Sequence, residues 1–234
     1  MPASPSSPSR RRPGPRRSVD LERIVQTALG VLDEGGPAAL SLRSVAERLG
    51  LRPNALYTYV ADRTALDQAI VERVLAEAAP STLPLGEGSW RERIVTIAIS
   101  VRAALLRHPG AVPLFMTAPM TGRQALAVGE RLLALLVRSG ASQEEAARAA
   151  YAVMTYVLGS VALEVAETDA RPPLPSEAER VAERRMRLDA VDASSHPYTA
   201  ATRAVAATWV TAEQFLWGLD RLLDGLTPDP RRVP

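Results

Sequence analysis

Residues 40–66 read LSLRSVAERLGLRPNALYTYVADRTAL, and this stretch decides how the first part of the chain folds. Its first apolar residues recur at helical spacing; they are Leu42, Val45, Ala46 and Leu49. Ser41 precedes them as a favourable N-cap residue. Gly50 follows them at the position where a left-handed C-cap conformation strains glycine least. The stretch therefore predicts a short helix that ends in a tight glycine turn.

A second short helix is expected over residues 53–60, after the glycine turn. Pro53 suits the first helical position because its φ is already fixed near the helical value. The only large aliphatic residues of this helix are Leu56 and Val60. A helix this short is unstable alone, so its neighbours must hold it while its polar and aromatic side chains face outward. That is the geometry of a recognition helix in a DNA-binding helix-turn-helix, although any helical hairpin with a glycine turn shares the spacing.

The helix-turn-helix hypothesis assigns DNA contacts by side-chain chemistry. Asn54 and Thr58 can reach base edges or phosphates, and Arg43 can pair bidentately with guanine. Arg52 and Arg63 flank the second helix and are expected to contact phosphates. The full set of expected DNA-contacting residues is Ser41, Arg43, Arg52, Pro53, Asn54, Ala55, Tyr57, Thr58, Tyr59 and Arg63.

Three stretches, residues 21–32, 41–50 and 55–66, resemble the DNA-binding region of the tetracycline-repressor (TetR) family. The most specific is ALYTYVADRTAL at residues 55–66. The family pattern has a small residue at position 55, Leu-Tyr at 56–57, any residue at 58, Tyr or His at 59, and Val or Phe at 60. A basic residue follows at 63 and a Leu at 66, as in this chain. The resemblance implies a DNA-binding protein of the helix-turn-helix type.

The rest of the chain predicts amphipathic helices and no strand-type alternation, so the expected fold class is all-α. One helix is expected from a cap at Asp62 to about Ala79. Later helices are expected over residues 90–107, 121–139, 142–167, 176–188 and 211–226, with a proline-rich loop at 168–175. The expected organisation is a disordered basic arm at 1–17, a three-helix DNA-binding domain at 18–79, a C-terminal ligand-binding and dimerisation domain at 90–226, and a tail at 227–234.

The C-terminal region also resembles TetR-family regulators, at His108-Pro109 and at residues 140–146, 156–159, 196–198 and 215–226. The resemblance implies a homodimer in which the long helix and the final helix pair with their copies across a two-fold axis. The expected interface residues are Ala149, Ala152, Gly159, Phe215, Leu219, Leu222 and Leu223. It also implies a ligand cavity, for which the candidates are Phe115, Met116, Thr117, Tyr151, Met154, Thr155 and Trp209. Taken singly, each of these side chains also suits an ordinary core.

The charge of the chain is unevenly distributed. Residues 1–17 hold five arginines and no acidic residue, whereas residues 18–79 hold nine acidic residues and six arginines. A DNA-binding module usually carries a basic footprint, so this count argues mildly against DNA binding, and only the placement of the arginines favours it. The basic arm either contacts phosphates or a minor groove, or is a solvated extension without a role.

Composition and segment lengths set further limits. The chain has no cysteine, so it can hold neither a disulfide nor a thiolate metal site. The basic N-terminus is not followed by an apolar segment, so it is not a signal peptide. No apolar run is expected to be long enough to span a bilayer, and the protein is expected to be cytoplasmic with no membrane partner.

Neither a cofactor nor a catalytic site is expected. In tetracycline repressors a histidine ligates the drug-bound Mg²⁺, and Leu114 lies near the corresponding position here. Leucine cannot bind a hard cation, so a larger apolar or mixed metabolite or antibiotic is the favoured inducer. His108 and His196 both precede proline at helix boundaries, where a structural role in a turn is the ordinary one. No catalytic motif accompanies them, so an enzyme is the least supported of the rival hypotheses.

The resulting functional hypothesis is a ligand-responsive regulator that binds double-stranded operator DNA as a homodimer. A repressor released from a palindromic operator by a small molecule is favoured. A transcriptional activator and a ligand-independent regulator of the same fold remain alternatives, because the position of the operator decides between repression and activation.

Overall fold

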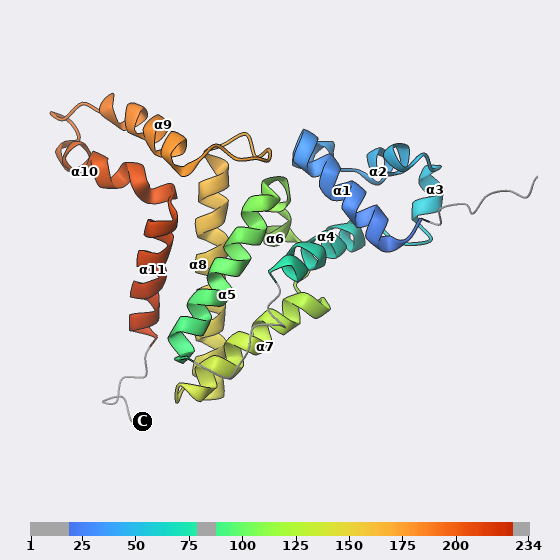
Figure 1. The fold of residues 1–234 in the computed structure, drawn as a ribbon, viewed down its shortest axis with the longest axis horizontal. Helices are drawn as coiled ribbons and strands as arrows, with labels where there is room; N and C mark the ends of the chain where they lie inside the picture. The colour runs from blue at the N-terminus through green and yellow to red at the C-terminus, as the bar shows by residue number, and fades with distance from the viewer. Residues whose placement is uncertain (1–18, 79–87, 227–234) are drawn as a thin grey trace, which may run out of the picture.

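The structure, a computed structural model, describes residues 19–78 and 88–226, and every regular element in these two ranges is helical. The expected arm at 1–17 and tail at 227–234 lie outside the described residues. We call residues 19–78 the head and residues 88–226 the body; they lie at opposite sides of Figure 1. The head contains α1 (Leu21–Gly35), α2 (Leu42–Leu49), α3 (Pro53–Leu56) and α4 (Arg63–Glu77).

The helix boundaries of the head follow its local sequence signals. The Ser41 side chain accepts a hydrogen bond from the Ser44 N–H, and Ser44 closes a reciprocal capping box at the start of α2. Gly50 ends α2 at φ 68° and ψ 27°, the left-handed conformation that glycine adopts with least strain. Asp62 caps α4 by accepting from the Ala65 N–H. The expected second helix is wrong in length, because α3 covers only Pro53–Leu56 and residues 57–59 form a turn.

The body contains seven α-helices over residues 88–226. They are α5 (Trp90–Arg107), α6 (Leu114–Thr117), α7 (Arg123–Arg138), α8 (Gln143–Ala166), α9 (Glu177–Asp189), α10 (Pro197–Ala207) and α11 (Ala212–Gly225). No sequence pattern predicted α10, because the alanine-rich sequence of this helix carries only a weak apolar stripe. It forms by packing on α9, with which it makes a hairpin (Figure 1).

Helix α8 is the central helix of the body and packs against α5, α7 and α11. Its 24 residues are long and apolar enough to cross a membrane by length and composition, so the expectation that no such run exists is wrong. Val153, Val157 and Val161 on one of its faces are buried in the body, as expected for a core helix of a folded domain. The length and composition of α8 are therefore only weak evidence of a membrane span.

The head joins the body through α1 and α4. The start of the α5–α6 connection lies so close to α1 that a Cβ on Gly110 would stand 2.6 Å from the Leu32 carbonyl oxygen. Helix α4 packs against α5, α6 and α7. The orientation of α2 and α3 is consequently set by contacts that α1 and α4 make with the body.

Candidate DNA-binding surface and sites of the body

The turn after α3 presents two tyrosines to solvent. Leu56 and Val60 are 0% and 4% exposed, and they anchor the segment to the core of the head. Tyr57 and Tyr59, which lie between these two anchors in the sequence, are 55% and 43% exposed. A fold rarely leaves two large aromatic side chains in water side by side unless a partner covers them. The local sequence therefore produces a small, rigidly anchored aromatic surface.

The residues that flank the tyrosines extend this surface. Arg52, Pro53 and Asn54 are exposed, and the Arg52 guanidinium has no ion-pair partner within residues 19–78 and 88–226. The Thr58 hydroxyl is exposed but donates to the Ala55 carbonyl at 2.7 Å, so it stabilises the turn and keeps only its acceptor capacity. Most of the expected DNA-contacting residues therefore lie together on one exposed segment.

Two of the expected arginines are already engaged by carboxylates. Arg43 Nε donates to Glu47 Oε1 at 2.8 Å on the exposed face of α2, a pair that solvent screens. Arg63 Nε donates to Asp67 Oδ1 at 2.6 Å, and another nitrogen of its guanidinium donates to the Leu40 carbonyl oxygen. Arg63 thus joins α4 to the chain just before α2 and positions the helix-turn-helix, a structural role that the sequence did not reveal.

The structure places the main residues of the expected dimer interface on α11 inside the body. Phe215, Leu219 and Leu223 are buried inside the body itself, and Ala149 on α8 is buried as well. These side chains fill the core between α11, α8 and α5, so they are not available to a second chain in this packing. Ala152, Gly159 and Leu222 are only half-buried, and they remain at the edge of the outer surface.

Different residues form the apolar outer faces of these two helices. Tyr151 and Leu163 of α8 are 76% and 71% exposed, and Trp217 of α11 is 61% exposed, with Leu216 beside it. The helical periodicity identified the apolar residues of α11, but it could not decide which side of the helix faces its own domain. The Trp217 side of α11 was therefore missed.

The expected ligand residues differ widely in burial. Phe115 is buried, whereas Met116 and Thr117 of the same short helix are exposed. Tyr151 and Thr155 lie on the exposed side of α8, which contradicts their assignment to an internal cavity. Trp209 is 57% exposed, with the Arg184 guanidinium 5.2 Å from its ring centroid. Met154 is half-buried, so only it and Phe115 remain compatible with an internal ligand.

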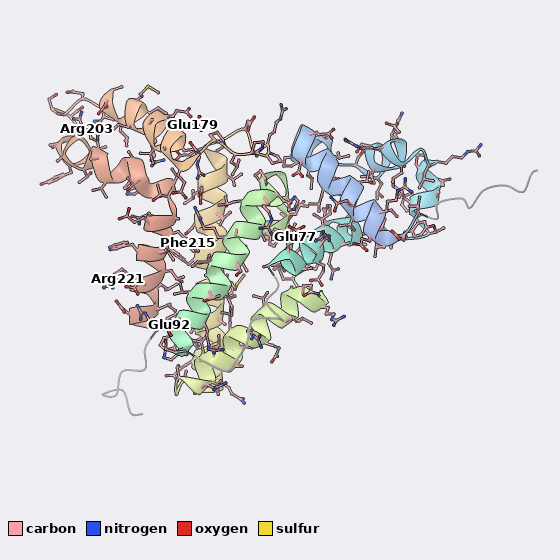
Figure 2. The ribbon with its side chains drawn as sticks, in the orientation of Figure 1. Glu77, Glu92, Glu179, Arg203, Phe215 and Arg221 are labelled. Carbon is pink, nitrogen blue, oxygen red and sulfur yellow. The ribbon has the colours of Figure 1, made fainter. Side chains whose placement is uncertain are left out.

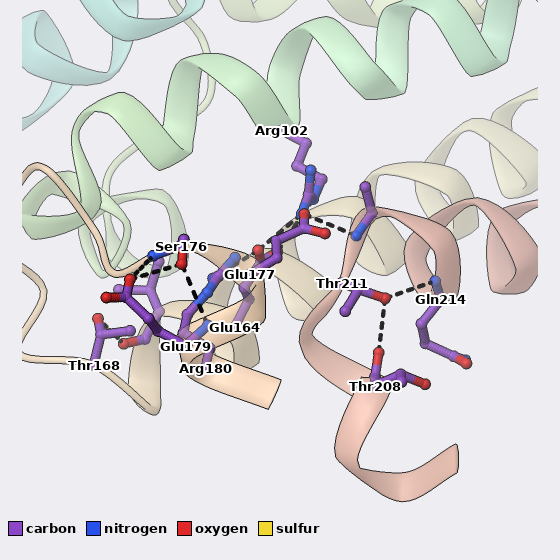
Figure 3. Close-up of polar contacts among 12 residues, drawn as sticks. Arg102, Glu164, Thr168, Ser176, Glu177, Glu179, Arg180, Thr208, Thr211 and Gln214 are labelled. Atoms are coloured by element: carbon purple, nitrogen blue, oxygen red, sulfur yellow. Dashed lines mark hydrogen bonds and ion pairs between the residues drawn. The ribbon is translucent and has the colours of Figure 1, made fainter. Parts of the chain in front are cut away.

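Charged residues of the body form a buried network that the sequence analysis missed. Glu164 of α8 is only 4% exposed and receives Arg102 of α5 at 2.8 Å (Figure 3). Arg180 of α9, itself 6% exposed, lies 2.8 Å from the same Glu164 oxygen. Glu177 approaches Arg102 at 3.2 Å and also accepts from the Ala212 N–H at the start of α11. The network joins α5, α8, α9 and α11.

A second polar cluster lies where the head meets the body. Glu77, at the end of α4, is labelled beside α5 in Figure 2. It receives Arg107 at 3.1 Å and the His108 ring at 3.3 Å. The other ring nitrogen of His108 lies 3.4 Å from Asp33 of α1. The neighbouring carboxylates of Asp33 and Glu77 favour the protonated ring and raise the pKa of His108 despite its partial burial.

A carboxylate of the head also caps a helix of the body. Glu72 of α4 accepts from the N–H groups of Gln124 and Ala125, at 2.7 and 3.0 Å, in the first turn of α7. The carboxylate fills the space beside Gly122, where an added Cβ would stand 2.2 Å from Glu72 Cδ. Negative charge at a helix N-terminus is stabilising, so this contact fixes α7 to α4.

The structure therefore has an exposed aromatic surface in the head and an apolar outer face in the body. Polar side chains, among them Glu72 and Glu77, connect the head to the body. No group of three or more His, Cys, Asp or Glu side chains in the described ranges is arranged to hold a metal ion. The arrangement suits binding and conformational coupling.

Comparison with known proteins agrees with this arrangement. Residues 83–228 match the family model described as tetracyclin repressor-like, C-terminal domain. A transcriptional regulator of the helix-turn-helix type from Saccharopolyspora erythraea is 35% identical over 144 residues, and the match covers 61% of this chain and 60% of the relative. The repressor DrrR1 of Streptomyces coeruleorubidus is 30% identical over 221 residues, which covers 92% of this chain and 81% of the relative.

Solved structures show the same fold. A possible TetR-family regulator from Streptomyces coelicolor has a TM-score of 0.75 at 34% identity, covering 88% of this chain and 98% of that one. ActR of the same organism, in complex with actinorhodin, has a TM-score of 0.74 at 25% identity, covering 89% of this chain and 97% of ActR. These similarities extend over both the head and the body.

Proposed function

Because the chain belongs to the TetR family of transcriptional regulators, we propose that it is a repressor that leaves a palindromic DNA operator when a small molecule binds its body. The observation that carries the proposal is the exposed surface of Arg52, Asn54, Tyr57 and Tyr59 on a segment held by buried Leu56 and Val60. Its exposure is explained if base edges and phosphates cover it. The relative DrrR1 is a transcriptional repressor, which favours repression over activation.

The protein acts as a homodimer in this proposal. The exposed apolar faces of α8 and α11, with Tyr151, Leu163 and Trp217, are the surface that a second copy covers. A two-fold dimer places the two recognition segments about one DNA turn apart, or a small multiple of it, and so reads a palindrome. Pairing of the two outer faces also explains why α8 is apolar on more than one side.

The inducer is a small molecule other than tetracycline–Mg²⁺. Leu114 near the metal-ligand position is buried and aliphatic, and offers no donor for a hard cation. ActR is similar to this chain and has been seen with actinorhodin, which supports a larger apolar or mixed metabolite or antibiotic as the class of inducer. We also propose that the protein is cytoplasmic, needs no cofactor and catalyses no reaction; an activator or a ligand-independent regulator is the alternative.

Selection of DNA from a random library with the purified full chain tests the DNA-binding proposal. We expect enrichment of a palindrome and loss of at least about tenfold in affinity for Tyr57→Ala, because a specific base or phosphate contact contributes about 1–3 kcal/mol. Tyr198→Ala is the matched control, since Tyr198 is 87% exposed on the body. Failure to enrich any sequence, or equal losses in the two variants, contradicts the proposal.

Sedimentation tests the dimer. Trp217→Glu combined with Leu163→Glu is expected to give folded monomers, because two charges buried at an apolar interface are strongly unfavourable. Met186→Glu is the control, since Met186 is equally exposed on α9 but lies away from these two helices. An intact dimer in the double variant would place the interface elsewhere.

A further inference from the structure

A pocket of about 530 Å³ lies between the C-terminal end of α5 and the loop that joins α8 to α9. Its lining residues are Leu106, Arg107, Pro172, Pro173, Leu174 and Arg180. None of the ligand candidates from the sequence analysis lies in this lining. The volume is in the range of small-molecule sites.

The lining combines four apolar residues with two arginines and contains no acidic residue. A neighbouring pocket shares Pro172, Pro173 and Arg180, but its walls include Glu167, Asp169 and Glu183. The acidic side chains are thus on one side of the two prolines only. The side that faces α5 is suited to an apolar molecule that carries a negative charge.

The guanidinium of Arg180 has unused hydrogen-bonding capacity. Arg180 is 6% exposed, and its Nε is buried without a hydrogen-bond acceptor among the described residues. Glu164, its one close carboxylate, is shared with Arg102 (Figure 3). A buried donor left without an acceptor is unfavourable, so a movement of the Arg180 side chain that brings this nitrogen to an acceptor in the pocket gains binding energy.

We propose that this pocket, the Arg107–Arg180 pocket, binds an apolar organic anion such as a hydrophobic carboxylic acid. The acid group pairs with the two guanidinium groups, and the hydrocarbon part covers Leu106 and Leu174. The inference deepens the proposed function, on which its regulatory part rests, by assigning a ligand class and a place on the body.

Binding in the pocket has a direct route to the head. Arg107 donates to Glu77 of α4, with nitrogen–oxygen distances of 3.1 and 3.2 Å. Glu77 also holds His108, whose ring faces Asp33 of α1. A carboxylate in the pocket competes with Glu77 for Arg107 and weakens this link between body and head. A ligand changes DNA affinity only if it binds differently to the protein with and without the Arg107–Glu77 pair. Competition between the ligand and Glu77 for Arg107 supplies that difference.

Methyl NMR of the full chain with ¹³C-labelled leucine methyl groups tests the pocket. The probes are 2-naphthoate, 3-phenylpropionate and decanoate, each compared with its neutral carboxamide at the same concentration. We expect at least one acid to shift the Leu106 and Leu174 methyl signals, with the carboxamide at least about tenfold weaker. Shifts with none of the acids, or equal binding of acid and amide, overturn the proposal.

Three variants assign the effect to the pocket. Arg107→Gln is expected to weaken the acid at least tenfold, and Leu174→Trp to block it by filling the volume, while both variants keep the methyl spectrum of a folded protein. Arg123→Gln removes an exposed arginine of α7 outside the lining and is expected to leave binding unchanged. Equal weakening by Arg107→Gln and Arg123→Gln would show attraction by net charge alone and overturn the site.

DNA measurements separate this inference from the proposed function. If the acid shifts the pocket signals and also lowers affinity for the selected palindrome, both are supported. If the acid binds without affecting DNA affinity, the regulatory route through Arg107 is wrong and the DNA-binding proposal stands. If no DNA sequence is selected at all, the proposed function fails, while the NMR experiment still decides the existence of the pocket.

Discussion

The head and the body stabilise their helices in different ways. In the head most polar contacts are local: Asp20, Ser41 and Asp62 each cap the helix that follows them within three residues. In the body Ser89, Ser142 and Ser176 cap their helices in the same way, and in addition buried charged side chains join helices far apart in sequence, as Arg102 does with Glu164. Both parts therefore use short-range capping signals, and the body depends in addition on buried charged contacts between distant helices.

The difference bears on regulation. The apolar core of the head is continuous with that of the body, so the head can respond to changes in the body through packed side chains. The polar contacts that orient it pass through Glu72 and Glu77 of α4 and Asp33 of α1, and they lie beside the apolar packing of α1 and α4 on the body. Changes in the body that disturb these side chains are therefore expected to alter DNA affinity without unfolding the head.

The largest expected effect is in the buried network of the body. Glu164→Ala leaves Arg102 and Arg180 buried without their shared carboxylate, and we expect a loss of about 3–5 kcal/mol in the free energy of unfolding. Chemical denaturation at a fixed protein concentration measures it, because unfolding of a dimer depends on concentration. Glu144→Ala on the same helix is the control: its pair with Arg148 is exposed, and the expected loss is below about 0.5 kcal/mol. Equal losses in the two variants would show that the buried Glu164 network stabilises the fold no more than the exposed Glu144–Arg148 pair does.

The clamp between α4 and α7 is expected to contribute less. Glu72→Ala removes the acceptor of two backbone N–H groups, with an expected loss of about 1–3 kcal/mol. Gly122→Ala forces the same carboxylate away and should be destabilising in the natural chain but nearly neutral when combined with Glu72→Ala. Additive effects in this double-mutant cycle would show that the two residues do not act on one contact. Glu130→Ala, exposed on α7, serves as the control.

Within the head, Arg52 and Arg63 are expected to differ in DNA binding. Arg52 is exposed, and Arg52→Ala should flatten the slope of log affinity against log salt by about one unit per chain, since one phosphate contact is lost. Arg63→Ala should reduce the stability of the head by about 1 kcal/mol, because the Leu40 carbonyl loses its donor. An unchanged slope for Arg52→Ala would place that residue off the DNA.

The smallest expected effect is the pH dependence of the junction. The pKa of His108 is raised in the folded protein by Asp33 and Glu77, so protonation favours the folded junction. This stabilisation is fully present below the unfolded-state pKa of histidine and is lost as the pH rises through the raised value. Thermal unfolding between about pH 5 and 9 should show a difference between the natural chain and His108→Gln that decreases with rising pH. A difference that grows with pH would contradict this assignment.

The sequence by itself determined the helical fold and the family, and it singled out the segment that we propose contacts DNA. Ser41, Gly50, Pro53 and Asp62 are local signals, and their conformational preferences act within a few residues wherever the chain goes. The resemblance of residues 55–66 to the TetR family pointed to the same function that the exposed tyrosines support. The length of the second helix could not be predicted, because contacts of Leu56 and Val60 with the rest of the head determine where it ends.

Only the tertiary structure decided the sites of the body. Periodicity shows that α11 has an apolar stripe, but burial of Phe215 and exposure of Trp217 depend on how α11 packs against α8 and α5. Likewise the buried pair of Arg102 and Glu164 joins residues 62 positions apart, and Glu72 meets α7 more than 50 positions later. No local pattern marks such partners, because the free energy of these contacts arises only when the assembled helices exclude water around them.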